Sequence, residues 1–312
     1  MTQEKSEITR FGKISYEYAV GALKASRFAP LGEDGFARIK GAGYSSAVKL
    51  ISEYGYPPAA EGFSPADSID KLTEQLIGFI KAHSPDPILT GALFFEEDAR
   101  NLKIYLKAAR TSQNTFGGGA EDSGFSLPSG AFDKEILKIC GESGDFSLLG
   151  KDLETALSGA AEINDPSFLS CKVDNAFFSR SVNVAKKARE TSLQKLLITY
   201  GELRNSLTSL RLNRLGRDEK EHSYAFLPIG GESNIGENYN EPGESMINAK
   251  SGGYDKIIAK YVKEFEKTLD ELDFDGQIGF IARFFFLKKA EATRLRLIFA
   301  EKAAAEKERG VE

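Results

Sequence analysis

The chain has 312 residues, of which 28% are charged, and a formal net charge of −5. A chain of this length can bury a full hydrophobic core in two domains, or in three smaller ones if it contains an internal repeat. The acidic balance offers no overall attraction to nucleic acid or anionic lipid, so we expect no nucleic-acid partner. The two cysteines, Cys140 and Cys171, lack the spacing of a redox or zinc motif, which favours a reducing cytoplasmic compartment.

The sequence contains no segment that resembles a targeting or membrane-spanning helix. Its first ten residues, MTQEKSEITR, lack the apolar run of a signal peptide. The most apolar stretch, 278–304, is broken up by charged side chains that include Arg283, Lys288, Lys289, Glu291, Arg294 and Arg296, whereas a spanning helix needs about 18 uninterrupted apolar residues. We therefore expect no direct membrane span.

Apolar residues recur at helical spacing along most of the chain, and no series of alternating strands with hairpin signals is found. The sequence therefore predicts an all-α fold. The predicted helices are 14–27, 35–53, 69–81, 92–110, 133–140, 148–161, 174–215, 254–272 and 278–307. The segment 174–215 is long enough to form two helices or one helix bent at Gly201.

Two glycine-rich segments, 115–130 and 227–253, divide the chain into near thirds. This division predicts three helical domains that arise by internal triplication. The predicted domains cover residues 1–116, 117–219 and 220–312.

A short motif recurs once in each third of the chain, as DARNLKIYLK, ELRNSLTSLR and EATRLRLIFA. Each copy begins with an acid and has Asn or Arg three residues later. The pairs are Asp98 with Asn101, Glu202 with Asn205, and Glu291 with Arg294. The acids lie about one third of the chain apart, which favours triplicated helical units over chance matching of a short pattern.

The acids of the motif are interpreted as structural groups that fix the register between packed helices. Glu291 falls on the apolar face of its helix and is expected to be at least partly buried. Arg294 lies one turn further on, where it is expected to pair with Glu291. Asp98 similarly interrupts an apolar line, with Asn101 one turn away. The second copy, at Glu202, fits this pattern less closely.

No pattern in the sequence points to catalysis, a cofactor or a bound metal. A di-iron helical bundle needs two Glu-x-x-His pairs, and only His222 follows a glutamate, Glu219, at that spacing, while His83 does not. Glycines 117–119 lack the preceding strand and the following Lys-Ser or Lys-Thr of a phosphate loop. We therefore predict no catalytic residue, no cofactor and no metal, and we assign no residue to partner contacts.

Together with the repeat, four segments carry a resemblance to the C subunit of the V-type and A-type rotary ATPases, which corresponds to the d subunit of the eukaryotic vacuolar enzyme. They are YEYAVGALKASRFAPL (16–31), FFEEDARNLKIYLKAA (94–109), DNAFFSRSVNVAKKARETSLQKLLITYGELRNSLTSLRLNRLG (174–216) and FFFLKKAEATRLRLIFAEKAA (284–304). The resemblance covers most of the chain. Departures from the family pattern are Arg294 in place of Asn, Ser206 in place of a large apolar residue, and the glycine-rich segment 227–253.

The resemblance implies three similar helical domains arranged around a pseudo-threefold axis as a funnel. It implies a non-catalytic subunit that links the central stalk to the membrane rotor ring and couples ATP hydrolysis or synthesis to proton or sodium transport. Such a subunit is present in one copy per complex, is monomeric when free, and lies on the cytoplasmic side, peripheral to the membrane through the ring. No cofactor is implied.

Two other functions remain open from the residues alone. Stacked helical units present extended surfaces whatever their ancestry, so a helical-repeat adaptor with unrelated soluble partners is the main alternative. An all-α enzyme of the aspartate-rich, prenyl-transferring type is the other, with EEDAR (96–100) as its acidic cluster. These acids are adjacent in sequence, whereas metal chelation on one helix face needs them a turn apart.

Overall fold

The computed structural model describes residues 15–58, 64–114, 128–229 and 277–308, together with some residues between 262 and 270. Within these residues all regular structure is helical and no strand occurs, which confirms the predicted all-α class. None of the helices in this part of the chain combines the length and apolar character that crossing a membrane requires.

The first six helices include the one that carries the first copy of the motif, and a break inside a segment predicted as one helix. They are α1 (Tyr16–Ala25), α2 (Glu33–Gly41), α3 (Tyr44–Glu53), α4 (Pro65–His83), α5 (Pro87–Gly91) and α6 (Phe95–Asn114). The prediction of one helix over 35–53 is wrong, because Ala42 and Gly43 have extended backbone and separate α2 from α3. A capping box of Ser64 and Asp67, with Pro65 in the first turn, sets the start of α4.

The middle of the chain forms α7 (Lys134–Ser143), α8 (Lys151–Leu157), α9 (Pro166–Lys187) and α10 (Thr191–Arg214). The predicted segment 174–215 is therefore two helices, and Gly201 lies inside the second one. The break occurs at Arg189, whose φ of 59° is in the left-handed region and stops the helix. The backbone N–H of Glu190 then bonds to the carbonyl of Ala185 and closes the end of α9.

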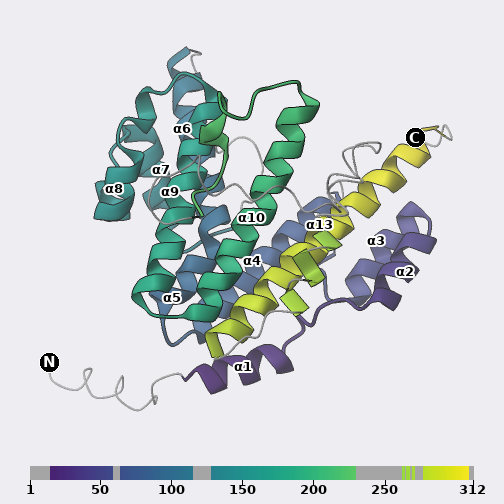
Figure 1. Ribbon diagram of the computed structural model, residues 1–312. Helices are drawn as coiled ribbons and strands as arrows, with labels where there is room; N and C mark the ends of the chain where they lie inside the picture. The colour runs from purple at the N-terminus through teal and green to yellow at the C-terminus, as the bar shows by residue number, and fades with distance from the viewer. Residues whose placement is uncertain are drawn as a thin grey trace, which may run out of the picture.

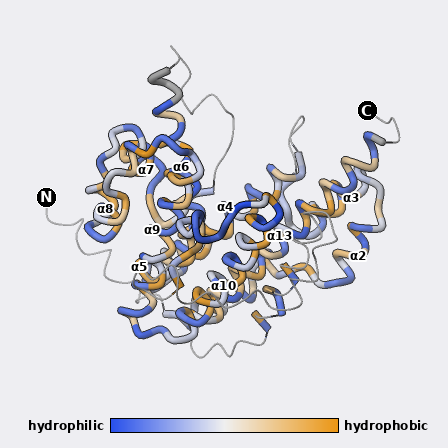
Figure 2. Tube along the Cα trace, turned by 45° about the horizontal axis from the view of Figure 1, so that its top comes forward, coloured by the Kyte–Doolittle hydropathy of each residue, from blue (hydrophilic) through white to orange (hydrophobic). Residues whose placement is uncertain are grey.

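The long helix α13 (Gln277–Glu308) crosses the molecule diagonally and packs against α1, α3, α4 and α10 (Figure 1). Hydrophobic and hydrophilic residues alternate along the helices, as expected for amphipathic segments around a shared core (Figure 2). In α13 the buried aromatic residues include Phe284, Phe285 and Phe286. The helix thus belongs to the core along its first half.

Aromatic side chains at the start of α6 connect the motif helices within one hydrophobic core. Phe94 packs edge-on against Phe285 of α13, with ring centroids 5.1 Å apart. Phe95 packs against both Phe178 of α9 and Tyr200 of α10 at 5.7 and 5.6 Å. These contacts fix the relative positions of α6, α10 and α13, the three helices that carry the repeated motif.

Candidate functional site

The first motif copy, on α6, holds a loop through two buried side chains. Asp98 is 1% exposed and accepts hydrogen bonds from the backbone N–H groups of Ala131 and Phe132, at 2.9 and 3.2 Å. Asn101 is fully buried and donates from Nδ2 to the carbonyl of Pro128 at 3.0 Å. Both side chains therefore satisfy backbone groups of the segment 128–132, which would otherwise be costly to bury.

The second copy, on α10, holds a different loop with only one of its two motif residues. Asn205 is buried, donates to the carbonyl of Leu227 at 2.9 Å and accepts from the N–H of the same residue at 2.7 Å. Glu202, one turn earlier on the helix, is exposed. The interpretation of the acid as a buried packing group therefore does not hold for Glu202, because the amide of Asn205 already satisfies both backbone groups.

The third copy, on α13, contains the predicted buried glutamate but with a different partner. Glu291 is 2% exposed, which confirms its predicted burial. Its Oε2 accepts from the backbone N–H of Leu31 at 2.6 Å, and its Oε1 accepts from the hydroxyl of Tyr56 and the ammonium of Lys288.

The predicted pair of Glu291 with Arg294 is wrong. Arg294 instead makes a two-point contact with the carboxylate of Glu33, at 2.7 and 3.0 Å, and reaches Glu266 at 3.3 Å. Its guanidinium also lies over the ring of Phe36, 3.6 Å from the centroid. Arg294 is therefore directed toward α2, while Lys288, also three residues from Glu291, is buried and neutralises it.

The segments held by the three motif helices share a second short sequence pattern. Each contains or directly adjoins a Pro-x-Gly sequence, at 30–32, 128–130 and 228–230. This Pro-x-Gly repeat can be read in the sequence, but only the hydrogen bonds show that each copy lies in or beside a segment held by a motif helix. The held segment lies after its helix in the first two copies, and near the start of the chain in the third.

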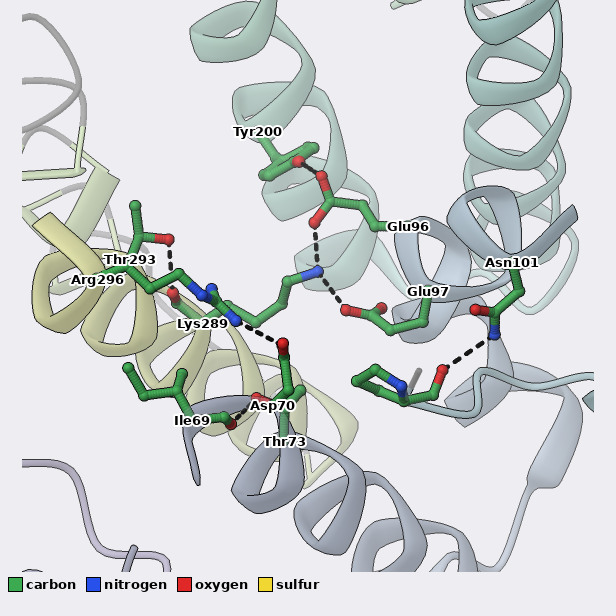
Figure 3. A network of polar contacts seen from close by, with 11 residues as sticks. Ile69, Asp70, Thr73, Glu96, Glu97, Asn101, Tyr200, Lys289, Thr293 and Arg296 are labelled. Atoms are coloured by element: carbon green, nitrogen blue, oxygen red, sulfur yellow. Dashed lines mark hydrogen bonds and ion pairs between the residues drawn. The ribbon is translucent and has the colours of Figure 1, made fainter. Parts of the chain in front are cut away.

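The three motif helices also meet around a polar pocket of about 290 Å³. Most of its lining side chains are charged and come from α4, α6, α9, α10 and α13. Lys289 of α13 bonds to Glu96 and Glu97 of α6, and Tyr200 of α10 donates to Glu96 (Figure 3). One cluster of polar contacts therefore joins all three motif helices.

Glu96 and Lys289 of this cluster remain charged despite their burial. Burial alone would raise the pKa of Glu96, but the attraction of Lys289 and Arg204, with the hydrogen bonds from Lys289 and Tyr200, lowers it below its ordinary value. Burial alone would lower the pKa of Lys289, yet the carboxylates of Glu96 and Glu97 raise it. Glu96 and Lys289 therefore keep their opposite charges at neutral pH.

Two further ion pairs connect helices at the rim of the pocket. Arg296 of α13 bonds to Asp70 of α4 at 2.7 Å, as Figure 3 shows, and Lys103 of α6 bonds to Asp174 of α9 at 2.6 Å. In addition, Oε2 of Glu97 and Nε of Arg100 are buried and have no hydrogen-bond partner within the described structure. Two polar atoms of residues that line the pocket are therefore buried without a hydrogen bond.

The adjacent acids at 96–100 do not converge on one site that could bind a metal or a diphosphate. Glu96 and Glu97 bond to Lys289, whereas Asp98 bonds to the backbone of 131–132, so the adjacent acids serve different contacts. Among the described residues, no group of His, Cys, Asp and Glu is placed to hold a metal ion. Glycines 117–119 lie outside the described residues.

Neither cysteine has the features of a nucleophile. Burial, the charge of Asp174 and other nearby groups raise the pKa of the Cys171 thiol to about 11, and burial also raises the pKa of Cys140. Comparison of the chain with protein-family models and with curated protein sequences finds no match. We therefore infer function from the contacts of the chain's own residues.

A pH-dependent contribution to stability is expected from Asp98. Burial raises its pKa from 3.8 to about 7, although the N–H groups of Ala131 and Phe132 oppose the shift. Because the folded state binds this proton more tightly than the unfolded state, the contribution of Asp98 is greatest below about pH 4 and is lost as the pH rises through 7. Asp98→Asn removes this titration.

Urea unfolding of the wild type and of Asp98→Asn from pH 4 to pH 8 measures this effect. The stability of the wild type relative to the variant should fall with rising pH, by at most about 1.4 kcal/mol per pH unit. A difference that stays constant, or that grows with pH, would show that Asp98 is ionised throughout this range.

Proposed function

We propose that the chain is a non-catalytic coupling subunit of a V/A-type rotary ATPase. In this role it links the central stalk to the membrane rotor ring, so that ATP hydrolysis or synthesis in the complex is coupled to proton or sodium transport. The main supporting observation is that three helices with one motif meet around one polar pocket, while each holds a Pro-x-Gly segment. The resemblance in sequence covers the same three helices.

The proposed architecture is three similar helical units around a pseudo-threefold axis, with boundaries at 1–116, 117–219 and 220–312. An axis through the pocket would relate α6, α10 and α13, and this accounts for their meeting at one place. The buried side chains of Asp98, Asn205 and Glu291 would then make corresponding loop contacts in the three units, with Asn205 at the fourth motif position and the two acids at the first. One copy per complex and a cytoplasmic, peripheral position follow from the same proposal.

We place the contact with the central stalk at the polar pocket. Its lining of mixed charges suits a polar surface of a partner protein better than an apolar ligand. The ion pairs between α4, α6, α9 and α13 connect helices from distant parts of the chain. A force applied at the pocket would therefore reach all of these helices.

The test is co-sedimentation of the purified chain with membranes that contain the rotor ring, in the presence of the central-stalk proteins. We expect the wild type to sediment with them, and Arg204→Glu, a change of an exposed base at the pocket, to weaken binding about tenfold, or about 1.4 kcal/mol. Lys151→Glu makes the same charge change at an exposed position on α8 and serves as the control. Circular dichroism verifies that both variants are folded.

Failure of the wild type to bind either the stalk or the ring would exclude the proposed function. Binding that is equally strong for the wild type and for Arg204→Glu would retain the coupling role but place the stalk contact elsewhere on the chain.

A further inference from the structure

Helices α2 and α3 form a small lobe that lies beside the C-terminal half of α13, apart from α5 to α9 (Figure 1). We call residues 29–58 the N-terminal lobe. Buried side chains hold its two helices together, with Phe36 and Ile39 on α2, and Ala47 and Ile51 on α3. These side chains belong to the same hydrophobic core as Leu295 and Phe299 of α13, so the lobe packs on the C-terminal half of that helix.

The N-terminal lobe contacts the second half of α13 through aromatic and polar side chains. The ring of Tyr44 meets Phe299 edge-on at 5.9 Å, and the ammonium of Lys302 donates to the carbonyl of Lys40 at 2.9 Å. The partner of Arg294 in the lobe, Glu33, has a side chain that is 81% exposed. Because the carboxylate of Glu33 is exposed, its ion pair with Arg294 contributes little to holding the lobe.

One buried contact differs from the rest, and it lies at Glu291. The carboxylate receives the N–H of Leu31, which precedes α2, and the hydroxyl of Tyr56, which follows α3. It therefore binds the chain segment that leads into the α2–α3 hairpin and the segment that leads out of it. Lys288 completes the set of donors and neutralises the charge, and all three side chains that meet here are at most 5% exposed.

The direction of this contact along the chain is also different from that of the other motif copies. Asp98 and Asn205 hold segments that follow their helices by a few tens of residues, whereas Leu31 lies 260 residues before Glu291. Glu291 therefore joins two parts of the chain that are remote in sequence. We propose that this contact is a latch: Glu291 holds the N-terminal lobe on α13, and loss of its hydrogen bonds frees the lobe to move as a unit.

The surroundings of the latch allow such movement without loss of the main core. An open cavity of about 540 Å³, lined by Leu31, Gly55 and Glu291 among others, lies directly beside it. On the other side of the latch, the first half of α13 is anchored by Phe285 and Phe286, which are fully buried. Release of the lobe would therefore enlarge an existing opening, while the packing around the polar pocket is retained.

Hydrogen–deuterium exchange of the full chain, read by mass spectrometry, tests the latch without any partner protein. We expect Glu291→Ala to speed exchange in 33–53 at least tenfold and to leave 134–187 unchanged. Glu291→Gln should give a smaller effect in the same region, because the amide keeps one acceptor oxygen; this variant carries the test if the alanine variant does not fold. Glu202→Ala, at the equivalent but exposed position of α10, should exchange like the wild type.

A second control separates a latch from general loss of stability. Phe286→Leu weakens the core on the same helix, on the side that packs against Tyr200 and Phe265. If Phe286→Leu, at a similar drop in melting temperature, produces the same selective exchange in 33–53, the lobe is simply the least stable part and the latch is wrong. Exchange that is unchanged in both Glu291 variants, or that rises equally in 134–187, would also overturn the proposal. None of these outcomes depends on whether the chain belongs to a rotary ATPase.

Discussion

Replacement of Lys289 with alanine is expected to destabilise the chain by about 3–5 kcal/mol. The substitution leaves the carboxylates of Glu96 and Glu97 close together without their shared cation, and the side chain of Glu97 is only 4% exposed. Urea unfolding at pH 7, followed by circular dichroism, measures the loss. The effect should exceed that of any other single change of a charged residue on α13, apart from changes at the buried Lys288–Glu291 pair.

Two control variants make this prediction specific to the buried cluster. Lys307→Ala removes an exposed cation from the same helix and should change stability by less than about 0.5 kcal/mol. A triple variant, Glu96→Gln, Glu97→Gln and Lys289→Met, removes the charges together and should recover much of the loss. If Lys289→Ala unfolds at the same urea concentration as Lys307→Ala, the cluster does not hold the three motif helices together.

The second large effect is expected for Gly130→Ala, in the loop that Asp98 holds. A Cβ atom at this position would overlap the buried carboxylate of Asp98, well inside van der Waals contact. The carboxylate cannot withdraw without losing its bonds to the backbone of 131–132. We expect a loss of about 1–3 kcal/mol, measured by the same urea unfolding.

A second glycine, whose replacement by alanine should stabilise the chain, serves as the control. Gly78 is exposed in the interior of α4, where an added Cβ meets no atom within 4 Å, so Gly78→Ala should stabilise by about 0.5–1 kcal/mol. In an Asp98→Ala background, Gly130→Ala should cost less than it does alone, because the clash is removed. Costs that simply add would mean that the two residues are not in contact in solution.

The sequence was sufficient to predict the fold class and the positions of most helices, because the apolar residues of α4, α6 and α13 recur at helical spacing. The end of α9 and the break between α2 and α3 were harder to predict. The chain leaves α9 through Arg189, which adopts the left-handed conformation that is usual for glycine. The sequence instead points to Gly201 as the position of a bend, and Gly201 lies inside α10. The break at Ala42 is flanked by Gly41 and Gly43, but the helical spacing of the apolar residues over 35–53 masked this signal.

The candidate site could be predicted only in part for a related reason. The apolar line around Glu291 was enough to predict its burial, but Lys288 and Arg294 are both three residues away, and local spacing cannot choose between them. The choice is made by α2, where Phe36 and Glu33 attract the guanidinium of Arg294. The donors to Glu291 from the N-terminal lobe are more than 200 residues away in sequence and give no local signal.

The polar pocket was missed because its members look ordinary in sequence. Glu96, Glu97 and Lys289 occur in charged stretches of α6 and α13 that resemble a solvated helix surface. Only the packing of the aromatic residues at the start of α6 brings these faces together. Charged residues adjacent to buried phenylalanines, as at 94–97 and 284–289, were the one available indication.

The central claim is that this chain couples the stalk of a rotary ATPase to its membrane ring. Native mass spectrometry of the tagged protein, purified from its own organism in mild detergent, tests this most directly. We expect one copy of the chain together with the stalk and ring subunits of a rotary ATPase. Recovery of the chain alone, or with unrelated soluble proteins, would contradict the claim and favour a helical-repeat adaptor.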